Sequence, residues 1–90
     1  MKVKNGLTLR RLGSRFMIVD AGPLNSDPTA VHTLNETAAA IFSFIAANPG
    51  ADTAAIARFL TSEFEVSLDR ATADASRITA LWIAEGLLSE

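Results

Sequence analysis

The stretch that decides the fold is AVHTLNETAAAIF, residues 30–42, in which a short strand-like run meets the start of a helix. Asn35 suits a helix N-cap, because its side-chain oxygen can accept a hydrogen bond from a free backbone N–H of the first turn. Glu36 suits the positive end of the helix dipole. Apolar residues then recur on one helical stripe, at Ala38, Ile41, Phe42 and Ile45. This joint predicts a strand over residues 29–34 that ends abruptly at Leu34, which would allow its outer edge to stay uncovered.

Upstream of this joint, two short apolar-rich runs predict a β-hairpin. The runs are LTLRRL, residues 7–12, and RFMIVD, residues 15–20, and Gly13-Ser14 lies between them. A glycine-first pair suits a two-residue type II′ turn, because glycine tolerates a positive φ. The following segment, AGPLNSDPT, is rich in residues that favour loops.

Downstream of the joint, two more helices are expected. Asp52 or Thr53 begins the second, and its apolar residues again fall on one face. Ser67 suits the cap of a last helix from about Leu68 to Glu85, and Gly86 suits its C′ position. The order predicts an α+β, winged helix-turn-helix-like fold, with a three-stranded antiparallel sheet followed by three helices. We expect residues 1–90 to form a single domain.

Composition narrows the possible functions. The 90 residues are 49% hydrophobic and 20% charged, with a formal net charge of −2 and no cysteine. A nucleic-acid-binding protein usually carries a strongly basic face, so this charge argues against one. The N-terminal residues contain no long apolar run of the kind a secretory signal needs. The most apolar stretch, Ala38–Ala47, is too short to span a bilayer. A cytoplasmic protein with no membrane association is expected.

The sequence also lacks the patterns of an enzyme. His32 is the only histidine, whereas a metal site needs several ligands. No phosphate-binding glycine loop and no recognisable carboxylate pair is present. We therefore expect no catalytic residue, no metal site and no cofactor.

Three motifs occur in order along the chain. The first is LNETA, residues 34–38, followed by Ile41-Phe42. The second lies in residues 56–66, where Ile56-Ala57 and Leu60 begin a helical pattern that ends at Phe64 and Val66. The third is GLL, residues 86–88. Together they resemble the PqqD family, the small chaperone-like proteins of pyrroloquinoline quinone (PQQ) biosynthesis. More broadly they resemble the recognition elements that bind leader segments of ribosomally made, modified peptides. The resemblance spans residues 7–88, with Phe42 where many relatives have tryptophan.

The resemblance implies a non-catalytic role in peptide binding. A leader peptide would add as a strand to the outer edge of the third strand, with its side chains in the groove beside the last helix. The bound precursor would then be presented to a modifying enzyme, such as a radical SAM enzyme or a protease. The candidate peptide-binding residues are Thr29, Ala30, Val31, His32, Thr33, Arg70, Asp74, Arg77, Ile78 and Leu81.

Two alternatives remain. The arginines around the hairpin turn, Arg10, Arg11 and Arg15, are the best argument for a winged-helix DNA-binding protein. Against it, Arg70 and Arg77 share the last helix with several acidic residues, so no nucleic-acid partner is expected. Alternatively the open edge pairs with another copy of the chain; we expect a monomer or a weak dimer.

Overall fold

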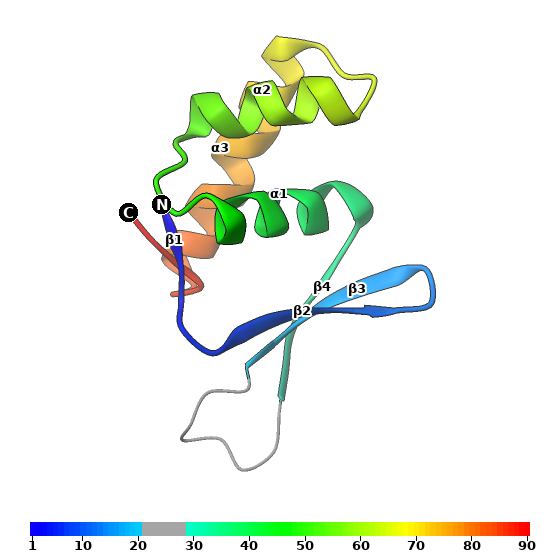
Figure 1. The fold of residues 1–90 in the computed structure, drawn as a ribbon, viewed down its shortest axis with the longest axis vertical. Helices are drawn as coiled ribbons and strands as arrows, with labels where there is room; N and C mark the ends of the chain where they lie inside the picture. Colours follow the sequence, from blue (N-terminus) through cyan, green and yellow to red (C-terminus); the bar gives the residue numbers. More distant parts are fainter. Residues whose placement is uncertain (21–28) are drawn as a thin grey trace.

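The computed structural model describes residues 1–20 and 29–90 (Figure 1). Three helices follow a three-stranded antiparallel sheet of order β2-β3-β4, which confirms the predicted α+β class. In the described part of the chain, no helix is long and apolar enough to span a bilayer. The elements are β1 (Lys2–Val3), β2 (Leu7–Leu12), β3 (Arg15–Asp20), β4 (Thr29–Leu34), α1 (Glu36–Ala47), α2 (Thr53–Glu63), α3 (Leu68–Ala84) and β5 (Leu88–Ser89).

The β2–β3 hairpin has the predicted two-residue turn. Leu12 stands opposite Arg15, which leaves Gly13 and Ser14 as the loop. Gly13 has a φ of 65°, and no described residue other than glycine has a positive φ. One positive φ at the first loop position is the pattern of a type II′ turn.

A β-bulge interrupts the pairing of β3 with β4, which the sequence did not reveal. Ile18 stands opposite His32 and the next residue, Val19, stands opposite Ala30, so β4 carries one extra residue at Val31. A bulge bends its strand and increases the local twist. Strict alternation along residues 29–34 therefore does not hold in this strand.

Side-chain caps begin all three helices: the predicted Asn35 and Ser67, and Asp52, one of the two residues expected to start α2. Asn35 Oδ1 accepts a hydrogen bond from Ala38 N at 2.8 Å, and Asp52 Oδ1 accepts one from Ala55 N at 2.8 Å. Ser67 Oγ accepts one from Arg70 N at 3.2 Å. Each bond satisfies an N–H that has no partner within its helix.

The end of α3 is a Schellman motif, also as predicted. Leu87 N donates to Trp82 O at 2.8 Å and Gly86 N donates to Ile83 O at 3.1 Å, while Gly86 has a φ of 79°. Leu87 behind the glycine is buried. This ending turns the chain back against the core.

The helices lie over one face of the sheet, and the core fills the space between them (Figure 1). Phe42 of α1 and Trp82 of α3 meet edge to face, with ring centroids 5.9 Å apart. The largest fully buried side chains are Ile18, Ile41, Ile45, Ile56 and Leu60.

The two ends of the chain form a second, two-stranded sheet. Strand β1 pairs with β5 in antiparallel register, with Val3 opposite Leu88. Lys4 N also donates to Leu87 O at 2.9 Å. The sequence did not predict this sheet. Its pairing places the C-terminal strand β5 against β1 rather than against β4.

Candidate functional site

Strand β4 lies at one edge of the three-stranded sheet. Its neighbour is β3, and no other described strand pairs with it. Its outer side therefore presents backbone N–H and C=O groups that no described strand satisfies. An edge of this kind can accept a further strand.

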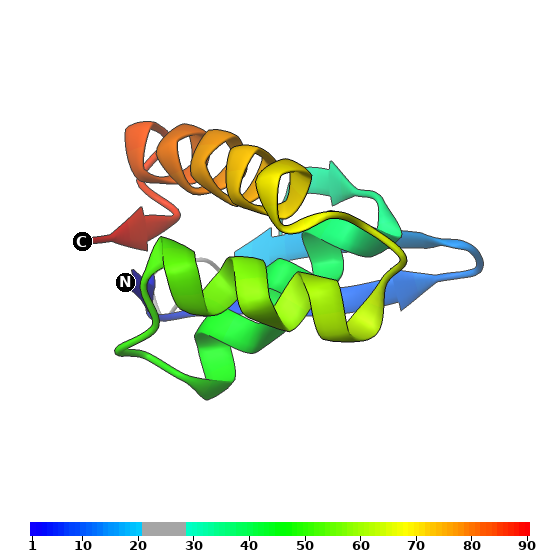
Figure 2. The ribbon, with the colours of Figure 1, turned by 90° about the horizontal axis from the view of Figure 1, so that it is seen from above.

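Beside this edge lies a groove that joins β4 to α3. Figure 2 shows the C-terminal part of β4 next to α3. The groove has a volume of about 200 Å³. It is lined by Thr33, Leu34, Asn35, Ala38, Arg77, Ile78, Leu81 and Trp82, and we call this set the β4–α3 groove.

The floor of the β4–α3 groove is apolar and fixed by the core. Ile78 and Trp82 are buried, and Trp82 is held by its ring contact with Phe42. Leu81 is instead 48% exposed, although leucine usually lies inside. An incoming apolar side chain would find one exposed wall and a buried apolar base.

Charged side chains line the same face of α3. Asp74 forms ion pairs with Arg70, four residues before it, at 3.8 Å and with Arg77, three residues after it, at 3.9 Å. Both arginine side chains are largely exposed, so these pairs add little to stability. They hold two cations around one carboxylate, and of the three residues only Arg77 lines the β4–α3 groove.

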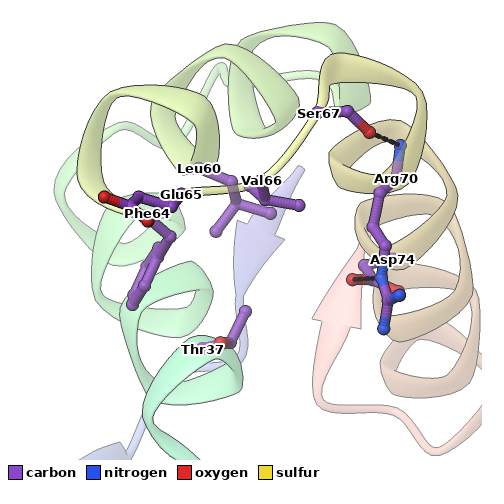
Figure 3. Close-up of a pocket in the computed structure, with 8 residues that line it drawn as sticks. All are labelled: Thr37, Leu60, Phe64, Glu65, Val66, Ser67, Arg70 and Asp74. Carbon is purple, nitrogen blue, oxygen red and sulfur yellow. Dashed lines mark hydrogen bonds and ion pairs between the residues drawn. The ribbon is translucent and has the colours of Figure 1, made fainter.

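A second, larger hollow of about 410 Å³ lies where the α2–α3 connection meets α1 (Figure 3). Leu60, Phe64 and Val66 face Arg70 and Asp74 across it. The predicted α3 residues are therefore divided between two places. Arg77, Ile78 and Leu81 line the β4–α3 groove with Thr33, whereas Arg70 and Asp74 line the second hollow.

The remaining predicted residues, Thr29, Ala30, Val31 and His32, precede Thr33 in β4. Their backbone belongs to the same open edge. The structure thus brings the strand and the helix of the predicted site together.

One known protein family matches most of the chain. A family model described as coenzyme PQQ synthesis protein D (PqqD) matches residues 24–88. The chain belongs to the PqqD family. Membership implies a peptide-binding partner role in PQQ biosynthesis, with a peptide and an enzyme as partners, and family members are non-catalytic, chaperone-like proteins. Neither the curated proteins nor the solved structures gave a significant match.

The PqqD match begins later than the resemblance drawn from the sequence motifs. Residues 7–23, which include the β2–β3 hairpin, lie outside the matched segment. The matched segment contains β4 and all three helices, and therefore both walls of the groove.

The predicted site omits four residues that line the groove: Leu34, Asn35, Ala38 and Trp82. Signals for them were present. Trp82 follows Ile78 by one helical turn, and Asn35 joins the strand directly to α1. Their roles in the core and in capping hid their position at the groove wall.

Among the described residues, no group of three or more histidine or acidic side chains could hold a metal ion. The geometry instead brings together the open edge of β4 and a groove whose buried floor is apolar. These suit binding of an extended chain.

Proposed function

We propose that this protein binds a precursor leader peptide by strand addition to β4 and holds it for a modifying enzyme. The observation that carries the proposal is the unpaired edge of β4 directly beside the β4–α3 groove. Main-chain hydrogen bonds to the edge would supply attraction that depends little on sequence, and the groove would select side chains.

The groove supports a peptide with an apolar anchor. Ile78 and Trp82 form an apolar floor and Leu81 offers an exposed wall. Alternate residues of an added strand point to the same side, so every second residue of the peptide would face the groove.

Presentation to an enzyme follows from this mode of binding. An edge-bound segment is held through one part of its length, and the rest of the precursor stays free to enter an active site on another protein. The partner enzyme would be a radical SAM enzyme, a protease or another peptide-modifying enzyme.

The direct test is an NMR titration of the full chain. The probe is a synthetic leader peptide from a short open reading frame beside this gene. We expect micromolar or tighter binding, which corresponds to roughly −8 kcal/mol or stronger. Amide shifts should concentrate at residues 29–34 and 70–82. If this peptide instead shifts the amide signals of residues 10–15, the proposal is contradicted.

Two control measurements separate the alternatives. A DNA-binding protein would show shifts with duplex DNA that weaken steeply as salt is added. A subunit that pairs through β4 with its own copy would sediment faster at higher protein concentration, and leader peptide would reverse that change.

A further inference from the structure

Charge is distributed very unevenly along this chain. Residues 1–19 contain five basic residues and no acidic one, although the chain as a whole has eight basic and ten acidic residues. Three of these five, Arg10, Arg11 and Arg15, lie around the turn of the β2–β3 hairpin, and all three are exposed. The hairpin is thus a basic element on an otherwise acidic protein.

The pairing register assigns the hairpin arginines to opposite faces. Leu12 stands opposite Arg15, and Arg10 stands opposite Met17. Directly opposed residues share a face, as do residues two apart on a strand. Arg10, Leu12, Arg15 and Met17 therefore form one surface, which we call the hairpin face.

Arg11 belongs to the other side of the hairpin. It stands opposite Phe16, and its guanidinium carbon lies 5.8 Å from the centre of that ring. Its Nε also donates to Gly13 O at 3.1 Å. Phe16 packs against the core, so Arg11 extends the side that faces the helices.

The hairpin face combines positive charge with an exposed apolar group. Leu12 is 59% exposed, more than any other large apolar side chain described, and it lies between Arg10 and Arg15. Figure 2 shows the hairpin turn extending past the ends of all three helices, where a large partner could reach it.

We propose that the hairpin face binds an acidic protein surface that carries an apolar residue at its centre. Charge complementarity selects the acidic partner, and Leu12 supplies a contact that a phosphate backbone would not use. The solvent-exposed arginines of α3, Arg70 and Arg77, are both paired with Asp74, so α3 does not offer a nucleic acid a second surface of unpaired arginines.

This proposal goes beyond peptide binding and stands without it. The hairpin face belongs to β2 and β3, whereas the leader peptide would occupy the far edge of β4. A partner on the hairpin would therefore leave the peptide site open, and both could bind at once.

The test uses NMR titration of the full chain with two synthetic acidic peptides at low salt. One peptide alternates glutamate with leucine, and the other alternates glutamate with serine. We expect amide shifts at residues 10–17, with tighter binding of the glutamate–leucine peptide. The variant L12S should bind the two peptides equally.

A matched pair of arginine variants tests the face. R15A and R11A remove the same charge from opposite sides of the hairpin. R15A should weaken binding of the glutamate–leucine peptide about three- to fivefold, within the range of an exposed ion pair, and R11A less than twofold. All three substituted side chains are exposed, and thermal unfolding checks that the variants remain folded.

Several results would overturn the proposal. If R15A and R11A lost the same affinity for the glutamate–leucine peptide, the attraction would be to positive charge in general and not to the hairpin face. Stronger shifts of the same amides with a 20-base-pair DNA duplex, unaffected by L12S, would assign the hairpin to nucleic acid. The proposal would also be contradicted if the acidic peptides shifted the amide signals of residues 29–34 and 70–82, or if they shifted none. A failed leader titration would affect the β4 site alone.

Discussion

Leu81 offers a sharp test of the β4–α3 groove because it is a large apolar side chain left half exposed at its wall. Full burial of a leucine side chain is worth roughly 1.5–3 kcal/mol. Because 48% of Leu81 is exposed, an apolar side chain that covers it would gain about 1 kcal/mol from this residue. The variant L81A should therefore weaken leader binding about fivefold.

The matched control is L68A on the same helix. Leu68 is 55% exposed but does not line the groove. Both variants should lose a similar, small part of the free energy of unfolding, because each leucine is about half buried in the free protein. L68A should leave leader affinity unchanged. Isothermal titration calorimetry measures the affinities, and urea unfolding measures the stabilities.

Two outcomes would refute this reasoning. Equal affinities for L81A and the unsubstituted protein would mean that the peptide does not cover this wall. Equal losses in L81A and L68A would mean that the effect comes from α3 as a whole rather than from contact in the groove.

Three further outcomes are expected. G86A should lower the free energy of unfolding by roughly 1–2 kcal/mol, because an L-residue is strained at a φ of 79°; G50A, which has equally open surroundings and no positive φ, should lose much less in the same urea unfolding. N35A should cost about 1 kcal/mol through loss of the cap, and N35D should restore most of it in thermal unfolding. Trp82, the only tryptophan, should change its fluorescence emission when leader peptide covers the groove, whereas the acidic hairpin probes should leave it unchanged.

Local features of the fold were predictable because their causes are local in the sequence. Asn35, Ser67 and Gly86 act on backbone groups within a few residues, so residue type and position suffice to predict them. The stripe of Ile41 and Ile45 likewise shows which side of α1 is buried.

Features that depend on distant pairing were not predictable. The sheet of β1 and β5 joins Val3 to Leu88 through strands of two residues each, which are too short to show periodicity. The bulge at Val31 depends on how β3 and β4 align, and no glycine marks it.

The candidate site was predicted only in part, for the same reason. Its elements followed from the family resemblance, and the structure brings Thr33 together with Ile78 and Leu81. The separation of Arg70 and Asp74 into another hollow depends on where α2 ends, because Phe64 and Val66 form its far wall. The pattern along α3 alone could not show which neighbour each turn would meet.

The two-stranded sheet of β1 and β5 has a practical consequence for engineering. It brings both ends of the chain to one corner, well away from the hairpin turn (Figure 2). A short linker could therefore join the ends, and a new start could be opened in the exposed turn at residues 48–50, without cutting β4, α3 or the hairpin. A reporter or an enzyme attached at either end of the chain would project from that corner and leave both candidate surfaces accessible.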